Sequence, residues 1–586
     1  MGDKVYLRAA PPQPFGTIAR DVARAFLLYT GVDPLNLGSH EGKGYLLALT
    51  PFDAALTLDI PGPPLPFGCS DRRLARGFTS QGRAATIYPA ATGNAARSSA
   101  NDDTPAATWV PGKLSGNFNY EIAIFSGADP TQGGSATVGV LELLDPDGEL
   151  DGLRTLGWDG APLMLLRGEP EAAYSTFSTV ARLSTAGLRY NTRKKEILLR
   201  DLAWRLTQAE LHGQRYGGTG GADGDATLAG RIKPYCVGSA FNIPPLQIGA
   251  TGLVYQVSCS SVLGIDTVKD GGAPLTFDAD HATYDLLAAA TVAPGIYATC
   301  LAHGLFRLGS APVYLVTADV RGDNDTIAGA SYPHTRAQIA RRIATGRGAI
   351  RLDDPADIDG AAFEALEQRQ TATLGYFWGN EITKASALAE VMAGCLGWWT
   401  MRLDGRIAIG QMEDPAGTAP LFSLSYPTAD GSVESRVDEP AMTDYRPPRR
   451  TTLMGWSRNY APMSANQIAG SVAQATAAIL RQDSRFTVSD DPWVAAGYPT
   501  APVVAVAGGF ANESDARLEG GRQGRLLRTR REYYEIAAVI DPFADVAGRV
   551  IAVLAADRLG LGAARNLFCF GIAVNGNAKP VLKLWG

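Results

Sequence analysis

The densest group of acidic side chains lies at positions 145–160, where four aspartates and one glutamate stand between glycines. Carboxylates at this spacing suggest calcium, because a calcium loop places oxygen ligands at its positions 1, 3, 5 and 12 and glycine at position 6. Counted from Asp145, the third and fifth positions are acidic, but the sixth is Leu150 and the twelfth is Leu156. Asp and Gly also dominate turns. We therefore interpret this segment as a turn-rich joint between two strands.

Other acid-rich and glycine-rich stretches also lack the spacing of a binding site. Residues 353–360 and 323–325 fail the same calcium test, so we expect turns there. The loop at 217–224 has no GKS or GKT and follows no apolar strand directly, which argues against a phosphate-binding loop. The tripeptide Arg321-Gly322-Asp323 matches an adhesion motif only as three common residues, and we expect no adhesive role.

No local pattern of a nucleophilic enzyme is present in the sequence. GxSxG does not occur, and Cys69 and Ser80 lie in Gly-rich and Pro-rich surroundings without a neighbouring histidine. The histidines, at 40, 212, 281, 303 and 334, form no local triad pattern. The paired carboxylates of a glycosidase have no fixed spacing in sequence, so a glycan-degrading enzyme remains an alternative.

Six arginines gather in and just after a predicted helix, and they are the only candidate site residues. They are Arg517, Arg522, Arg525, Arg528, Arg530 and Arg531. Such a set can line a path for DNA or for another acidic polymer. Acidic residues at 513, 515, 519 and 532 alternate with these arginines, which favours an ordinary solvated helix. We assign the six as possible lumen or subunit-interface residues and predict no catalytic, cofactor-binding or metal-binding residue.

The composition indicates a multidomain, turn-rich chain. With 586 residues, a prior of about four domains follows. Charged residues make up 19%, below the average of about 25%, while 66 Gly and 36 Pro exceed average use, which favours β structure over long charged helices. The formal net charge of −6 gives no overall field that attracts nucleic acid or an anionic membrane.

The cysteines and the N-terminal segment indicate a reduced protein without targeting signals. The cysteines, at 69, 236, 259, 300, 395 and 569, include no CxxC pair, which argues against a zinc ribbon and a dense disulfide framework. The first residues lack the apolar core of a secretory signal, and no run reaches 18 apolar residues. We expect neither a membrane span nor a myristoyl anchor.

Hydrophobic spacing predicts strands at both ends of the chain and helices between them. Helices are expected at 17–29, 334–344, 383–396, 467–482 and 513–531, and C-terminal strands at 533–540, 548–555, 566–574 and 579–585. Asp404-Gly405 stands between two alternating runs, which predicts a β-hairpin. The aromatic residues Tyr376, Phe377, Trp378, Trp398 and Trp399 are interpreted as core and subunit contacts. Strand-rich ends suggest that the N-terminal and C-terminal parts pack together.

The predicted fold class is mainly β with α+β insertions, built from antiparallel barrel or sandwich domains plus a small α+β domain. Five regions are expected. They are an irregular N-terminal adaptor at 1–112, a β-rich hub domain at 113–235, a second one at 236–332, an α+β domain at 333–450, and a C-terminal helix with strands that pack back on the hub at 451–586.

Several motifs in a fixed order resemble the tail-tip or baseplate hub protein of long non-contractile-tailed, siphovirus-like bacteriophages, prophages and gene-transfer-agent particles. They are 144–151 with 157–160, 228–238, 241–245 with Tyr255-Gln256, 304–309 with 317–322, 398–410 and 582–586. Together they span roughly 115–586, and the first hundred residues match nothing in the family. Some relatives carry an iron–sulfur cluster on clustered cysteines, but the cysteines here are scattered, so that site is not transferred.

The resemblance implies a non-enzymatic virion protein in the tail tip, assembled in the bacterial host cytoplasm and without a cofactor. Such hubs form a ring, commonly of three copies, that continues the tail tube. Their partners are the distal tail protein, other baseplate proteins, a central fibre or receptor-binding proteins, and the tape measure protein. DNA passes only in transit, and the host surface is contacted indirectly. A receptor-binding or carbohydrate-binding tail module is a further alternative.

Overall fold

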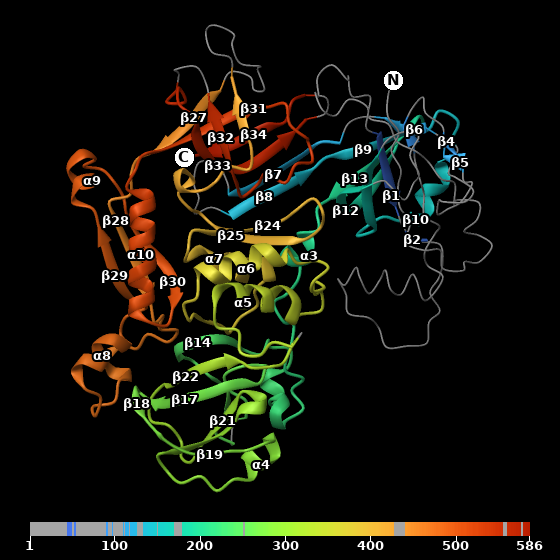
Figure 1. The fold of residues 1–586 in the computed structure, drawn as a ribbon. Helices are drawn as coiled ribbons and strands as arrows, with labels where there is room; N and C mark the ends of the chain where they lie inside the picture. Colours follow the sequence, from blue (N-terminus) through green and yellow to red (C-terminus); the bar gives the residue numbers. More distant parts are fainter. Residues whose placement is uncertain are drawn as a thin grey trace.

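A computed structural model describes most of the chain after residue 117 and six short strands before it (Figure 1). The described ranges are 118–125, 133–148, 150–168, 178–249, 252–327, 329–426, 440–554, 559–575 and 578–586, preceded by β1 (Gly44–Leu49), β2 (Phe52–Asp53), β3 (Ala90–Ala91), β4 (Ala96–Arg97), β5 (Trp109–Val110) and β6 (Gly112–Ser115). The helix expected at 17–29 lies outside the described residues. Within these ranges, no helix combines the length and apolar character that crossing a membrane requires.

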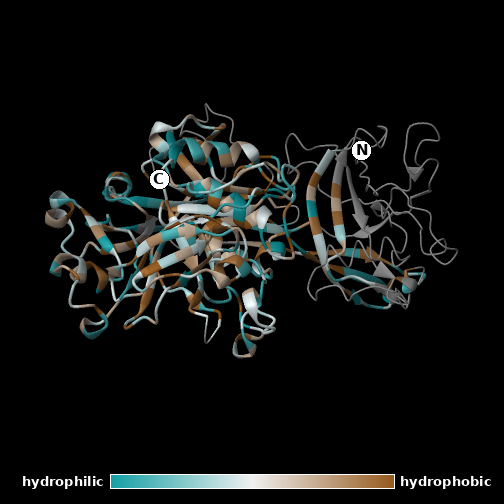
Figure 2. Cartoon of the chain, turned by 90° about the horizontal axis from the view of Figure 1, so that it is seen from below, coloured by the Kyte–Doolittle hydropathy of each residue, from teal (hydrophilic) through white to brown (hydrophobic). Residues whose placement is uncertain are grey.

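The chain is mainly β with α+β insertions, which confirms the predicted fold class. Figure 1 shows large sheets at the top, a helical layer below them, a β-rich lobe at the bottom, and a small sheet with a long helix along one side. Each described sheet is open, with strands at its two edges. Hydrophobic and hydrophilic residues alternate along many strands (Figure 2), as expected where one sheet face packs on a core.

Two large sheets form the upper part. The first runs β26-β32-β33-β34-β31-β27, with β7 and β8 joined to it through β33. Its strands are β7 (Tyr120–Phe125), β8 (Gly133–Val138), β26 (Ser423–Ser425), β27 (Ala441–Arg446), β31 (Arg531–Ala537), β32 (Arg549–Leu554), β33 (Arg565–Val574) and β34 (Val581–Trp585). The second sheet contains β9 (Val140–Leu144), β11 (Pro162–Gly168), β12 (Ser178–Tyr190) and β13 (Lys194–Arg200) with β1, β3 and β6, and β10 (Leu156–Gly157) pairs with β2.

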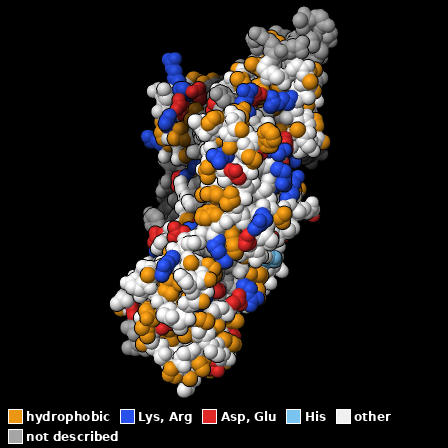
Figure 3. All heavy atoms as spheres, turned by 90° about the vertical axis from the view of Figure 1, so that its left-hand side faces the viewer, with side chains coloured by type: hydrophobic (Ala, Val, Ile, Leu, Met, Phe, Trp, Pro, Cys, Tyr) orange, Lys and Arg blue, Asp and Glu red, His pale blue; other side chains and the backbone are white. Residues whose placement is uncertain are grey.

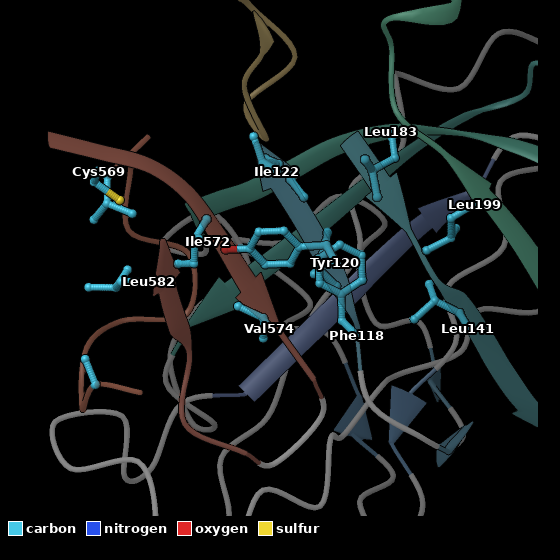
Figure 4. Packing of buried hydrophobic residues seen from close by; sticks show 14 of the residues in the cluster. Phe118, Tyr120, Ile122, Leu141, Leu183, Leu199, Cys569, Ile572, Val574 and Leu582 are labelled. Atoms are coloured by element: carbon cyan, nitrogen blue, oxygen red, sulfur yellow. The ribbon is translucent and has the colours of Figure 1, made fainter. Parts of the chain in front are cut away.

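The N-terminal and C-terminal parts share one sheet, as the strand-rich ends suggested. Strand β7 pairs antiparallel with β33, with Ile122 opposite Ile572. One continuous core lies between the two large sheets, and Figure 4 shows Tyr120 with Ile572 and Val574 on one side and Phe118 on the other. The Tyr120 hydroxyl donates a hydrogen bond to the Pro542 carbonyl within this core. Burial of these side chains therefore stabilises the packing of β7 against the C-terminal strands.

The lower lobe consists of two five-stranded sheets. The first has the order β18-β17-β22-β14-β23 and the second the order β15-β16-β21-β20-β19. Their strands are β14 (Tyr235–Ile243), β15 (Leu246–Gln247), β16 (Val254–Gln256), β17 (Val262–Asp270), β18 (Ala273–Pro274), β19 (Thr276–Asp280), β20 (Ile296–Cys300), β21 (Leu305–Leu308), β22 (Val316–Asp323) and β23 (Gly375–Trp378), with helix α4 (Tyr284–Ala289) beside them.

The helical layer contains α3 (Trp204–Thr207), α5 (Arg336–Arg341), a π-turn (Arg342–Gly346), α6 (Gly360–Arg369) and α7 (Lys384–Ala393). Two predicted helix starts are confirmed, because Thr335 and Thr383 accept hydrogen bonds from backbone N–H groups of the first turns of α5 and α7. The Asp404-Gly405 hairpin is also confirmed. It joins β24 (Gly397–Met401) to β25 (Ile407–Gln411), and Gly405 has a φ of +84°.

The small side sheet has the order β29-β28-β30, with β28 (Thr451–Trp456), β29 (Arg485–Asp490) and β30 (Val503–Phe510). Helices α8 (Gln474–Leu480), α9 (Pro492–Gly497) and α10 (Glu513–Leu527) accompany it. Helix α8 begins seven residues later than the predicted start at 467, because the backbone N–H of Ala469 bonds the Gly271 carbonyl in the lower lobe.

Candidate functional site

Helix α10, which carries most of the arginines, covers one face of the small sheet. The helix buries the side chains of Ala516, Glu519, Gln523 and Leu526. Its close approach depends on small residues, because a Cβ added to Gly520 would lie 3.3 Å from the Met454 Cβ. A Cβ added to Gly524 would lie 2.5 Å from the Ser489 Oγ. The backbone of α10 therefore packs directly on β28 and β29.

Replacing Gly524 with leucine is expected to lower the free energy of unfolding by about 1–3 kcal/mol, because the larger side chain forces helix and sheet apart. Gly521→Leu is the matched control, since a Cβ there would lie 3.5 Å from the flexible Arg525 guanidinium. The control gains helix propensity and should be neutral or stabilising. Urea denaturation followed by tryptophan fluorescence compares the two variants. Equal stabilities would contradict the close packing.

Arg522 faces the interior and links α10 to the helical layer. Its guanidinium donates to the Met412 carbonyl at 2.7 Å, to the Cys395 carbonyl at 2.6 Å and to Glu519 at 2.7 Å. Glu519 is 5% exposed and also accepts from Gln370 at 3.0 Å. The arrangement compensates a buried carboxylate with a charged donor. Arg522 is therefore committed to contacts inside the chain.

Arg531 lies at the start of β31 and is also buried. Its guanidinium donates to the Leu526 carbonyl at 2.8 Å and stacks over the Trp585 ring at 4.8 Å. This satisfies a carbonyl of the last helical turn of α10. The remaining four arginines of the predicted set, Arg517, Arg525, Arg528 and Arg530, are exposed. Arg517 pairs with Glu513 and Arg530 with Glu532. The structure thus divides the set into two internal and four surface residues.

The acidic segment 145–160 is a joint held by Lys195 of β13. Lys195 is 1% exposed, and its ammonium lies 2.9 Å from the Asp145 carboxylate and 2.8 Å from the Asp151 carboxylate. The hydrogen bond from Lys195, together with its charge, lowers the pKa of Asp151. In the described ranges, no group of three His, Cys, Asp or Glu side chains has the arrangement of a metal site. The turn interpretation therefore matches the observed contacts.

Asp323, the last residue of the Arg-Gly-Asp tripeptide, is fully buried. Its carboxylate pairs with Arg342 at 2.9 Å and with Arg347 at 2.6 Å, and it accepts from the Tyr235 hydroxyl at 2.7 Å. Arg321 is exposed and forms a surface pair with Asp266 at 2.8 Å. Because the aspartate side chain is inside, the tripeptide is not presented as a surface motif, as expected.

A cavity of about 300 Å³ lies where the first large sheet, β12 and the β24–β25 hairpin meet. Its lining includes the carboxylates of Asp404, Asp541 and Asp545. Arg402 bridges Asp545 to Asp359, which lies 3.0 Å away, and Arg406 donates to Asp404 at 2.7 Å. Arg402 thus joins the hairpin to its surroundings, whereas the pair of Arg406 and Asp404 lies within the hairpin.

The sequence analysis missed an apolar surface on the small sheet. Phe486, Val488 and Val503 are about half to two thirds exposed, and Trp493 of α9 is 85% exposed. The alternation in β29 was the available signal, since Phe486 and Val488 alternate with Thr487 and Ser489. Figure 3 shows this side of the molecule, where hydrophobic side chains lie among charged ones.

No protein-family model and no curated protein matches this sequence. Solved structures similar to the chain include the tail protein from Neisseria meningitidis MC58, with 10% identity, a TM-score of 0.32, and coverage of 80% of this chain and 91% of that chain. The 43 kDa tail protein of prophage MuSo2 from Shewanella oneidensis has 9% identity, a TM-score of 0.29, and coverage of 82% and 95%.

A chain from the virion of a native gene transfer agent particle is 13% identical, with a TM-score of 0.32 and coverage of 61% of this chain and 84% of that chain. Two of these similar structures are described as tail proteins, and the third is a chain of a gene transfer agent virion.

Proposed function

We propose that this chain is a structural subunit of a virion tail, at the tail tip or baseplate hub, where it forms a ring that continues the tail tube. The ring attaches a central fibre or receptor-binding proteins and gates the passage of the tape measure protein and DNA. Its neighbours are further copies of the chain, three in one ring, the distal tail protein and other baseplate proteins. The proposal assigns the chain no catalytic role.

The observation that carries the proposal is that motifs of the tail-tip resemblance meet in one sheet of the lower lobe. Asp319 of motif 317–322 accepts a hydrogen bond from the backbone N–H of Asn242, in motif 241–245, at 2.9 Å. Gly322 lies so close to motif 228–238 that an added Cβ would be 2.4 Å from the Cys236 carbonyl oxygen. These residues thus hold backbones together, which supports a framework role for the motifs.

A second pair of motifs meets in the neighbouring sheet. Strand β16 carries Tyr255-Gln256, and it pairs with β21, which carries the motif 304–309, so that Tyr255 stands opposite Phe306. The two rings stack with centroids 5.3 Å apart. Firmly held backbone joints are what a subunit of an interlocking assembly requires, because its function depends on shape and buried interface area.

The exposed arginines fit this proposal as residues facing the channel or a subunit seam. A channel that passes DNA without reading its sequence needs positive charge toward the phosphates. Arg525 and Arg528 follow each other on the exposed side of α10, close to the exposed Arg530. The assignment of these residues to the lumen or to a seam belongs to the proposal, and Arg522 and Arg531 are left out of it because of their internal contacts.

Cryo-electron microscopy of the purified chain with its neighbouring virion proteins tests the proposal. The expected result is a closed ring about an axial channel, with three copies and with α10 near the lumen or a seam. A particle that stays monomeric with and without these neighbours would overturn it. The glycan-degrading alternative would then be tested first, at the cavity lined by Asp404, Asp541 and Asp545.

A further inference from the structure

The face of the small sheet opposite α10 carries exposed apolar side chains on its two outer strands. In the strand register, Val488 stands opposite Leu453, Phe486 opposite Gly455, and Val503 beside Thr451, so these residues share one face. Val488 is 65% exposed and Val503 is 57% exposed. The alternate residues, such as Met454, point to α10. The sheet therefore has one face that α10 covers and one face that carries exposed apolar side chains.

Helix α9 connects β29 to β30 and exposes Trp493, which follows the last residue of β29 by three positions. The one carboxylate on the face, that of Asp490, lies at its end and pairs with Arg450 at 3.5 Å. Contiguous apolar surface with little charge is the composition of an interface core, and large exposed patches of this kind mark contact sites. We define the sheet patch as Phe486, Val488, Trp493 and Val503.

A second apolar group projects from the lower lobe at Val313–Leu315, which we call the loop patch. Its backbone is held rigidly, since the Asp270 carboxylate accepts from the N–H of Val313 at 2.8 Å and of Tyr314 at 2.7 Å. The N–H of Gly271 also bonds the Leu315 carbonyl at 3.0 Å. Val313 is 79% exposed despite this order. The fold thus fixes an apolar loop in an outward position.

The segments that carry the two patches have opposite charge. Residues 446–503 contain six arginines and three aspartates, a net of +3, with no lysine or glutamate. Residues 270–315 contain four aspartates and one arginine, a net of −3, again with no lysine or glutamate. Opposite net charges of the two segments favour docking of unlike segments over contact between like ones.

Among the described residues, the two patches make no contact with each other. The chain's own contact between the two segments is made by the region of α8, where Ala469 bonds Gly271 and Leu480 packs against Gly272. That contact leaves the loop patch and the sheet patch exposed. Within the described ranges, both patches therefore remain open to a partner.

We propose that the sheet patch of one copy packs against the loop patch of a second copy of this chain. The proposal deepens the proposed function, on which it rests, by naming the surfaces through which copies meet. Two different and complementary patches on one chain allow every copy to offer one and receive the other, which is the condition for a contact that repeats around an assembly. The apolar residues form the centre of the contact, and the arginines and aspartates of the two segments form its rim.

Disulfide trapping tests this contact on the full-length chain in a Cys69→Ser, Cys259→Ser background. Val488→Cys and Val313→Cys are prepared separately and then mixed under mild oxidation. The mixture is expected to give a covalent dimer, while each variant alone stays monomeric on a non-reducing gel. Mixing Val313→Cys with Tyr190→Cys is the matched control, because Tyr190 is 48% exposed on a different sheet. Salt above about 0.5 M should slow trapping, because it screens the rim charges.

The outcomes separate this inference from the proposed function. Cross-linking that occurs in the mixture of Val488→Cys and Val313→Cys but not in the control supports the contact. A variant that carries both cysteines then shows how many copies the contact links. A closed covalent trimer supports the ring, whereas dimers alone would keep the contact and overturn the ring. If microscopy shows a ring and the mixture gives no more cross-link than the Tyr190→Cys control, the ring stands and this contact is wrong.

Discussion

Replacing Asp323 with asparagine is expected to lower the free energy of unfolding by about 3–5 kcal/mol, because two buried guanidinium groups lose their counter-charge. Asp323 is fully buried and bonds Arg342, Arg347 and the Tyr235 hydroxyl. The asparagine keeps the shape of the side chain, so the loss measures charge compensation rather than a cavity. Arg347 also pairs with Asp325 at 2.7 Å, so part of its compensation survives.

Asp266→Asn is the control for this prediction. Asp266 pairs with Arg321, two residues before Asp323, but both side chains of that pair are more than 40% exposed. Exposed pairs contribute about 0–1 kcal/mol, so the control should unfold almost like the unchanged protein. Urea denaturation at pH 7 compares the variants. Similar losses of unfolding free energy for Asp323→Asn and Asp266→Asn would contradict the interpretation of Asp323 as the buried counter-charge of Arg342 and Arg347.

Replacing Lys384 with methionine is expected to raise the free energy of unfolding by about 2–4 kcal/mol at pH 6. Lys384 is fully buried in the first turn of α7, and its ammonium donates only to the Ala344 carbonyl, at 3.0 Å. Burial first, and then the charges of Arg351 and Arg205, lower the pKa of Lys384 to about 7. Methionine fills a similar volume without a charge.

The stabilisation should depend on pH in a defined direction. Between the folded pKa of about 7 and the ordinary lysine value of 10.5, the unfolded state binds the extra proton, so the stability of the unchanged protein rises with pH. The free energy of unfolding of the unchanged protein lies furthest below that of Lys384→Met at pH values under 7. Above pH 7 this difference shrinks by about 1.4 kcal/mol per pH unit. Thermal unfolding of both proteins at pH 6 and pH 9 measures the gap. A difference in stability that stays constant from pH 6 to pH 9 would contradict the lowered pKa of Lys384.

Local sequence signals predicted the elements that depend on neighbouring residues. The positions of α5 and α7, the Asp404-Gly405 hairpin and the four C-terminal strands needed only turn chemistry and periodicity. The aromatic residues Tyr376, Phe377, Trp378 and Trp398 are buried, and Trp399 is partly buried against the core of the helical layer, which confirms the core part of their interpretation. Their role as subunit contacts stays a prediction. The five described cysteines are free thiols, in line with their scattered positions.

The sequence could not predict interactions that form only through tertiary contacts. The alternating charges of α10 favoured a solvated helix, yet Glu519 and Gln523 are buried, because Gln370 donates to Glu519 and the Gly394 carbonyl accepts from Gln523, both from distant positions in the sequence. Helix α8 likewise starts late because its predicted first turns bond the lower lobe. The domain boundaries and the lumen position of the exposed arginines remain predictions.

The pairing of β7 with β33 determines when during synthesis the upper core can close. The ion pair between Lys583 and Glu121 joins residues 462 positions apart, and almost the whole chain must leave the ribosome before it forms. At roughly 5–20 residues per second, synthesis of the intervening chain takes about 20–90 seconds, during which β7 can pair with β8 but not with β33. A chain that stops early therefore keeps an unpaired strand edge and an open core. Completion of this sheet therefore distinguishes full-length chains from truncated ones.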